Sequence, residues 1–152
     1  ITEDGQFFYA MEYLDGVDLE ALVDQFGPVP AERAVHFLLQ ACDSLSDAHG
    51  QGLTHRDIKP ANLFLSRLGP SRDHLKLLDF GLVKAVDARK EAALTVAGSI
   101  TGTPLYVSPE GIEHPDEVDA RSDLYAVGAV GYFLLTGQPV FVGETVVEIC
   151  MH

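Results

Sequence analysis

The spacing of hydrophobic positions changes several times along this chain, and each spacing predicts a different element. Short apolar runs bounded by turn residues indicate buried strands, whereas apolar positions three or four residues apart indicate a helix with one buried face. The first run, residues 7–14, follows the turn Asp4-Gly5 and predicts a strand. Two shorter runs predict further strands at residues 63–65 and 75–78.

Three helices are predicted around these strands. A short one covers residues 18–26, and Pro30 suits the first turn of a long helix that ends at Gly50. The apolar stripe of the long helix comprises Val35, Leu38, Cys42, Leu45 and His49. Residues 124–135 are apolar on all sides, which predicts a buried central helix. Residues 79–103 are expected to be mainly loop.

Charge and cysteine content limit the classes of function. The formal net charge is -13 and the pI is about 4.6, so a nucleic-acid partner is not expected, because phosphate contacts need clustered Lys and Arg. Cys42 and Cys150 lie far apart, and Cys42 is expected to be a buried free thiol in a reducing compartment. The apolar run 124–135 is too short to span a bilayer, so no membrane segment is expected in this fragment.

Four polar residues form the strongest candidate for a chemical site. Asp57, Lys59 and Asn62 lie within six positions, and Asp79 follows on the turn Asp79-Phe80-Gly81. Together they supply a base for a hydroxyl, a cation for a phosphate and two oxygen ligands for a divalent metal. The alternative for each is a solvated loop residue, which this combination disfavours. The set predicts phosphoryl transfer.

This arrangement resembles the catalytic loop and metal-binding turn of eukaryotic-type (Hanks-type) serine/threonine protein kinases. Residues 102–110 resemble the end of a kinase activation segment, and Asp123 resembles the buried helix aspartate of the family, which accepts backbone amides of the catalytic loop. Lys59 and Thr103 are typical of serine/threonine kinases rather than tyrosine kinases. The amino-acid sequence of residues 58–62 and 122–125 is most similar to that of bacterial members of this family.

The resemblance implies an α+β, protein-kinase-like fold with a mainly helical C-terminal lobe. Residues 1–152 would form a partial kinase domain, in which residues 1–14 hold the last N-lobe strand and the hinge. Residues 15–152 would form the C-lobe, truncated near its end. We find no glycine-rich loop and no strand lysine paired with a helix glutamate, so most of the N-lobe is expected to be absent and the fragment inactive by itself.

The resemblance also assigns roles to individual residues. Asp57 would be the catalytic base, Lys59 would contact the transferred phosphate, and Thr103 would bond to both. Asn62 and Asp79 would hold Mg²⁺, with Mn²⁺ as the alternative ion. The residues expected to bind ATP are Met11, Glu12, Leu14, Asp18, Lys59, Leu63, Phe64 and Asp79. His55 is expected to support the Phe80 turn by packing rather than to act as a base.

Regulation is implied by Arg56, since an arginine before the catalytic aspartate usually marks control by activation-loop phosphorylation. The candidate acceptors are Thr95, Ser99 and Thr101, with Thr95 at the best distance; the alternative is that all three are ordinary loop hydroxyls. Glu110 pairs in the family with a downstream arginine that this chain lacks. The other histidines have no ligand spacing and are expected at the surface or in satisfied core positions: His36, His49, His74 and His114.

The predicted function is transfer of the ATP γ-phosphate to serine or threonine hydroxyls of protein substrates. The partners would be ATP and those proteins, and the kinase domain would be cytoplasmic, with membrane anchoring of the parent protein left open. One alternative is a pseudokinase-like module that binds nucleotide or protein. Another is a small-molecule kinase of the antibiotic-phosphorylating type, against which residues 102–110 count because such enzymes usually lack them.

Overall fold

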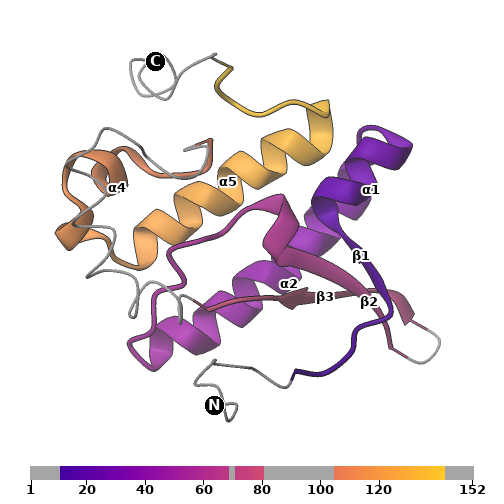
Figure 1. The fold of residues 1–152 in the computed structure, drawn as a ribbon, viewed down its shortest axis with the longest axis horizontal. Helices are drawn as coiled ribbons and strands as arrows, with labels where there is room; N and C mark the ends of the chain where they lie inside the picture. Colours follow the sequence, from indigo (N-terminus) through magenta and orange to yellow (C-terminus); the bar gives the residue numbers. More distant parts are fainter. Residues whose placement is uncertain (1–10, 69–70, 81–104, 143–152) are drawn as a thin grey trace, which may run out of the picture.

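The computed structural model describes residues 11–68, 71–80 and 105–142, which form an antiparallel sheet and several helices (Figure 1). The strands are β1 (Gly16–Asp18), β2 (Leu63–Leu68) and β3 (Ser71–Leu77). The helices are α1 (Leu19–Phe26), α2 (Ala31–Gly50), α4 (Pro109–Glu113) and α5 (Ala120–Thr136), with 3-10 turns η1 (Pro60–Asn62) and η3 (Pro115–Glu117). Helices α2 and α5 run side by side, and α2 also contacts β3. The elements are of the α+β class, as predicted.

The sheet has the strand order β1-β2-β3, with both pairs antiparallel. Strands β2 and β3 lie where the apolar runs predict them but extend further, at the loop end of the hairpin. Strand β1 pairs Gly16 with Ser66, and a Cβ on Gly16 would lie 1.9 Å from the carbonyl oxygen of Leu65. The glycine therefore lets β1 approach β2 closely.

The prediction of a strand over residues 7–14 is wrong for the part that the structure describes. Residues 11–14 are irregular, and the strand comes later, at β1. The apolar run could not show this, because β1 contains Gly16 and Asp18, which local propensity assigns to turns, and its pairing with β2 decides the conformation. Residues 1–10 lie outside the described part.

The helix ends follow from capping residues. Asp18 Oδ1 accepts the Ala21 amide at 2.8 Å and begins α1, which ends at Gly27 with φ 78°. Helix α2 begins at Ala31, with Pro30 as its N-cap, one position before the first turn in which the sequence analysis placed this proline. Helix α5 ends at Gly137, whose φ of 73° is left-handed and whose N–H donates to the Phe133 carbonyl at 2.8 Å.

The predicted apolar stripe of α2 is correct at Leu45 and is otherwise displaced by about one residue. The buried positions are Ala34, Phe37, Ala41, Leu45 and Ala48. Val35 is exposed, while Leu38 and Cys42 are only partly buried at the edge of the core. The alanines are weak hydrophobic signals in a sequence, but their small side chains allow other elements to pack closely on this face.

Helix α5 is less completely buried than its composition predicts. Ala126, Val130 and Leu134 lie in the core, but Leu124 and Leu135 are about half exposed, as is Tyr132. A Cβ added at Gly131 would lie 3.0 Å from a methyl of Leu38, so this glycine marks close contact with α2. No helix in the described ranges is long and apolar enough to cross a membrane.

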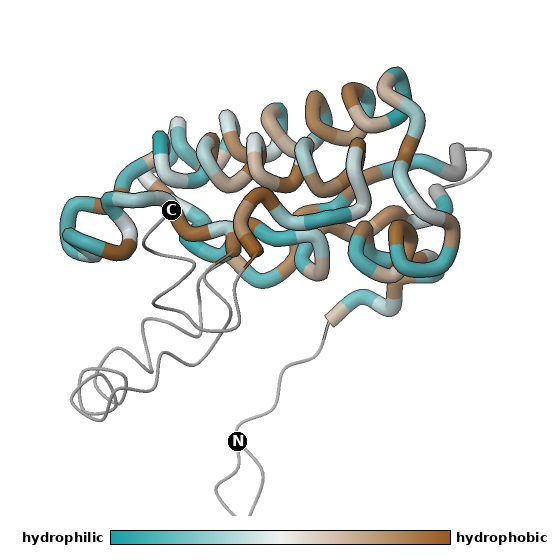
Figure 2. The backbone as a smooth tube through the Cα atoms, turned by 90° about the horizontal axis from the view of Figure 1, so that it is seen from above, coloured by the Kyte–Doolittle hydropathy of each residue, from teal (hydrophilic) through white to brown (hydrophobic). Residues whose placement is uncertain are grey.

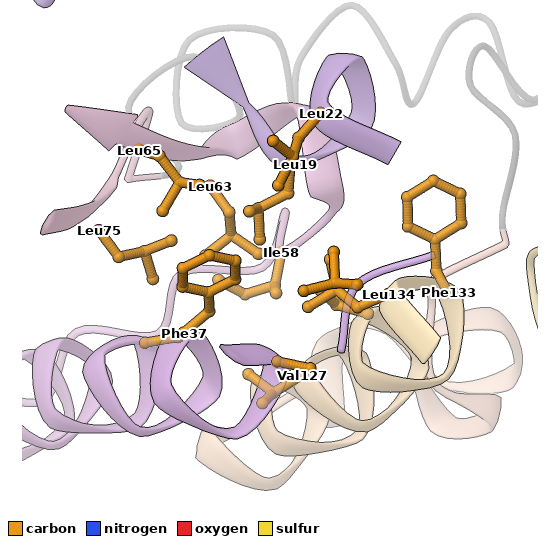
Figure 3. Packing of buried hydrophobic residues seen from close by; sticks show 14 of the residues in the cluster. Leu19, Leu22, Phe37, Ile58, Leu63, Leu65, Leu75, Val127, Phe133 and Leu134 are labelled. Carbon is orange, nitrogen blue, oxygen red and sulfur yellow. The ribbon is translucent and has the colours of Figure 1, made fainter. Parts of the chain in front are cut away.

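One hydrophobic core joins the helices to the sheet (Figure 3). Phe37 from α2, Leu19 from α1 and Leu134 from α5 point toward the same interior as the β2 and β3 leucines. Along the helices, brown and teal residues alternate within each turn, which is the pattern of amphipathic packing (Figure 2). Ile58 is a core member that belongs to no helix or strand, and it is 3% exposed. It anchors the segment between α2 and β2 in the core.

We predict that two leucines on α2 differ sharply in their contribution to stability. Leu45 is 1% exposed and Leu39 is 59% exposed. Leu45→Ala should lower the free energy of unfolding by about 2–5 kcal/mol, because it removes buried methyl groups and leaves a cavity. Leu39→Ala should change it by no more than about 0.5 kcal/mol. Urea unfolding of both variants measures the difference, and equal losses would contradict this packing.

Candidate active site

The segment from His55 to Asn62 alternates between buried and accessible residues. His55, Ile58, Pro60 and Asn62 are buried, whereas Asp57 and Lys59 are partly accessible. The buried residues attach the segment to the core, and the accessible residues carry charge. A rigid mount with charged groups on its open side suits a site that must hold reacting atoms in place.

Asp123 fixes the start of this segment. Its carboxylate is 1% exposed and accepts the backbone N–H of His55 at 2.8 Å and that of Arg56 at 2.9 Å. Arg56 has φ 66°, a left-handed conformation that costs about 1–2 kcal/mol in a residue other than glycine. The two charge-assisted bonds offset that cost. The expectation that Asp123 accepts backbone amides around residues 55 and 56 is confirmed.

His49 is a third donor to Asp123 that the sequence analysis did not single out. Its Nε2 lies 2.7 Å from Asp123 Oδ2, so α2 and α5 meet through a polar contact as well as through apolar ones. His49 is thus a satisfied, partly buried histidine, one of the two alternatives expected for it. Among the described residues, no group of three or more His, Cys, Asp or Glu could hold a metal ion.

His55 joins the segment to the Asp79 turn. Its Nε2 lies 3.0 Å from the Leu78 carbonyl, and its Nδ1 accepts the Asp57 amide at 3.3 Å, so the neutral Nε2-H tautomer fits both partners. Burial lowers the pKa of His55, which favours that neutral form. Its ring packs against Phe80 with 4.6 Å between centroids, which confirms the expected packing role.

Three of the predicted catalytic residues come together. Asp57 Oδ2 accepts from Lys59 Nζ at 3.1 Å and from Asn62 Nδ2 at 2.9 Å. Asn62 Nδ2 also donates to the Asp57 backbone carbonyl at 2.8 Å. These contacts fix the rotation of the carboxylate and of the amide.

The orientation of Asn62 suits a metal ligand. Both of its amide hydrogen bonds are made by Nδ2 and directed to Asp57, which leaves Oδ1 as the oxygen that a hard cation would use. Asp79, an exposed carboxylate, is brought to the same end of the sheet by the hairpin, because the Leu78 amide donates to the Asn62 carbonyl at 2.9 Å. Asp79 has φ 56°, a second left-handed residue at this place. The donor set fits Mg²⁺.

The residues expected to bind nucleotide are in different environments. Met11 is largely exposed, Leu14 is partly buried, and Glu12 forms an ion pair of 2.5 Å with Lys76 of β3. Asp18 caps α1, a role that the sequence analysis did not assign to it. Leu63 is a core residue and Phe64 is partly buried on β2.

The described part of the activation-segment motif is held against α5. Ser108 caps α4, and Glu110 accepts a hydrogen bond of 2.7 Å from Ser122, which lowers the pKa of Glu110. Glu110 therefore has a partner within the described residues. Tyr106 is partly buried, and burial raises its pKa to about 12. Thr95, Ser99, Thr101 and Thr103 lie outside the described residues.

Comparison with known proteins identifies the family. The protein kinase domain family matches residues 1–152. The chain is 43% identical over 147 residues to the serine/threonine-protein kinase pkn3 of Myxococcus xanthus, which covers 96% of this chain and 27% of that protein. It is 38% identical over 142 residues to PknB of Mycobacterium leprae, which covers 93% of this chain and 22% of that protein. The chain thus spans about a quarter of the length of these relatives.

A solved structure shows the same fold. The crystal structure of Rad53 1-466 in complex with AMP-PNP matches with a TM-score of 0.73 and 28% sequence identity, covering 93% of this chain and 33% of that one. The predicted protein-kinase-like fold is therefore confirmed, and so is the resemblance to bacterial members. On this match and on that of the family over its whole length, the chain belongs to the protein kinase domain family.

Proposed function

We propose that this chain carries the catalytic residues of an ATP-dependent serine/threonine protein kinase. One observation supports this most directly: the Asp57 carboxylate is held by Lys59 and Asn62 on a segment whose backbone Asp123 fixes. The same arrangement provides an accessible base beside a cation and beside a metal-ligand oxygen. Phosphoryl transfer needs mainly these three groups and their positioning.

In this proposal Asp57 acts on the acceptor. Its carboxylate accepts the proton of a serine or threonine hydroxyl and holds that oxygen in line with the γ-phosphate of ATP. Lys59, whose Nζ lies 3.1 Å from Asp57 Oδ2, contacts the transferred phosphate and balances its negative charge. Thr103 would bond to both residues. The phosphorylated protein and ADP are the products.

Asn62 and Asp79 would hold Mg²⁺, or Mn²⁺ in its place, through Oδ1 and the carboxylate. When bound, the ion neutralises charge on the phosphates. The chain's own part is to keep these two oxygens in a fixed relation, which the backbone bond between Leu78 and Asn62 provides. Few protein ligands are needed, because Mg²⁺ keeps several waters and binds phosphate oxygens.

The nucleotide would lie against residues 11–14 and β2. Backbone atoms of Glu12 and Leu14 would bond to adenine beside Met11, and Leu63 and Phe64 would pack beneath it. Asp18 would contact ribose through the carboxylate that also caps α1. The similarity to Rad53, whose structure holds AMP-PNP, supports this assignment.

A pseudokinase-like binding module is the second candidate. The sequence of the full-length protein outside this chain would decide between the two, since absence of a glycine-rich loop and a strand lysine there would favour a non-catalytic role. The intact set of Asp57, Asn62 and Asp79 favours catalysis. With catalysis as the function, we propose a cytoplasmic kinase domain with protein substrates as its partners.

We further propose that phosphorylation controls the site through Arg56, which precedes Asp57 and is exposed. A phosphate on Thr95, Ser99 or Thr101 would pair with this arginine by charge-assisted bonds and order the segment. The left-handed backbone of Arg56, fixed by Asp123, gives that side chain a defined starting direction.

Amide substitutions at Asp57 and Asp79 in the full-length protein should have different effects. Asp57→Asn should lower the rate of phosphate transfer by about 10²–10⁴-fold, the usual contribution of a general base, while ATP binding stays nearly unchanged. Asp79→Asn should weaken magnesium-dependent ATP binding as well. Transfer from Mg-ATP and calorimetric binding measure the two effects.

A matched control is Asp43→Asn, which changes an exposed carboxylate on α2 and should leave both quantities unchanged. Normal transfer by the Asp57→Asn protein would overturn the assigned role. Tight ATP binding without transfer in the unaltered protein would favour the pseudokinase.

Substitution of Asp123 should weaken both stability and phosphate transfer, because its buried carboxylate supports the segment that carries Asp57. In Asp123→Asn an amide N–H₂ replaces one acceptor oxygen and faces the donors of His55 and His49, which costs about 1–3 kcal/mol per buried donor left unpaired. The transfer rate should fall by up to about 100-fold, because Asp57 is displaced. Asp119→Asn is the control, since asparagine also caps a helix. Unfolding and transfer rates that matched that control would argue against Asp123 as the support.

The protein is expected to phosphorylate itself on the proposed acceptor hydroxyls. After incubation with Mg-ATP, mass spectrometry should find phosphate on Thr95, Ser99 or Thr101, and the triple alanine variant should start transfer more slowly. If the hydroxyls are ordinary loop residues, none is modified and the triple variant keeps the full rate.

A further inference from the structure

The outer edge of β3 is covered by side chains of α2. Strand β3 is at the edge of the sheet order β1-β2-β3, so its outward backbone groups have no neighbouring strand in the described sheet. Asp73 and Leu75 are two residues apart and present backbone groups on the same side of the strand. Helix α2 packs along this side.

Gln40 of α2 takes the place of a neighbouring strand. Its Oε1 accepts the Leu75 amide at 3.0 Å, and its Nε2 donates to the Asp73 carbonyl at 2.9 Å. One side-chain amide thus satisfies a donor and an acceptor on the strand edge, as the N–H and C=O of one residue in a neighbouring strand would. The pairing is specific in register, because a shift of β3 by one residue would turn these backbone groups away.

Arg33 of α2 attaches the same part of β3 through an ion pair with Asp73. Its Nε and Nη2 donate to the two carboxylate oxygens of Asp73 at 2.9 and 2.7 Å, a bidentate pair. The contact raises the pKa of Arg33 and lowers that of Asp73. The guanidinium also lies 5.1 Å from the centre of the Phe37 ring, which is fully buried, so the arginine is itself positioned by the core.

Strand β3, which Gln40 and Arg33 attach to α2, leads directly to Asp79, the carboxylate proposed to bind the metal ion. Leu77 ends β3 opposite Leu63, and the Leu78 amide bonds to the Asn62 carbonyl. Asp79 is the next residue, only four positions after Leu75. A slip or swing of β3 would move Asp79 relative to Asn62, which the neighbouring Asp57 holds independently.

We propose that Gln40, with the Arg33–Asp73 pair, positions Asp79 for metal binding by locking the register of β3 against α2. This inference rests on the proposed function, in which Asp79 and Asn62 share the ion. Gln40 bonds to β3 and is not among the residues proposed to hold the ion or the substrate, so it would be a positioning residue. Its effect should appear in metal affinity rather than in the chemical step.

The test compares Gln40→Met with the unaltered full-length protein. Methionine keeps the length and much of the volume of the side chain but removes both hydrogen bonds to β3, together with the contacts of the Gln40 amide with His36 on α2 itself. The free Mg²⁺ concentration for half-maximal ATP binding should rise about tenfold, as for other residues that orient metal ligands. Transfer to casein at saturating Mg²⁺ should change little. In the metal-free protein, the Leu75 and Leu78 amides should exchange hydrogen faster.

Gln51→Met is the matched control. It makes the same substitution at the C-cap of α2, where Gln51 donates to the Asp47 carbonyl, and it should change none of these quantities. Gln40→Glu keeps an acceptor for the Leu75 amide but sets a carboxylate oxygen against the Asp73 carbonyl. If Gln40→Met does not fold, Gln40→Glu and Asp73→Asn carry the test, with the same expected rise in the Mg²⁺ requirement.

The outcomes separate the two proposals. An unchanged Mg²⁺ requirement together with a lower melting temperature would overturn the positioning role and make Gln40 purely structural. Mg-ATP binding without transfer in the unaltered protein would overturn the proposed function, while the Mg²⁺ titration would still decide the role of Gln40. Absence of any Mg-ATP binding would overturn both.

Discussion

The buried carboxylate of Asp123 is the constraint on which the site depends. It accepts two consecutive backbone amides, at His55 and Arg56, and a ring N–H from His49. Consecutive amides can point at one carboxylate only if the chain turns sharply, and Arg56 turns by adopting φ 66°. The next residue is Asp57, so the direction of the proposed base follows from a charge buried in α5. Ile58 then returns the chain to the core, and the strained turn is held from both sides.

The second half of the site is placed by a different kind of interaction. Asn62 directly precedes β2 and Asp79 follows β3, so both lie at the open end of one hairpin, and backbone pairing between β2 and β3 sets the distance between them. Backbone hydrogen bonds are short and directional, which makes the hairpin a more precise spacer than side-chain packing. The hairpin meets the Asp57 segment at Asn62, whose amide bonds to Asp57 through Nδ2. The base and the metal ligands are thus coupled through one asparagine.

The sequence predicts the parts of this arrangement that are local. Short-range signals place the two ends of α2 near Pro30 and at Gly50, and the polar residues from Asp57 to Asn62 predict phosphoryl transfer. Long-range pairing leaves weaker signals. Neither β1 around Gly16 nor the alanine face of α2 could be predicted, because partners distant in sequence decide both. For the same reason, the bonds of Gln40 to β3 are not visible in the periodicity of its helix.

His55 shows how one buried residue links the two halves. It accepts the Asp57 amide on one nitrogen and faces the Leu78 carbonyl with the other, so it needs one protonated and one unprotonated nitrogen. Burial lowers its pKa, and that favours the neutral ring with this tautomer. A charged ring would direct an N–H at the Asp57 amide and lose the acceptor. The burial that favours neutral His55 therefore also preserves both of its hydrogen bonds. Those two bonds connect Asp57 to the turn that carries Asp79.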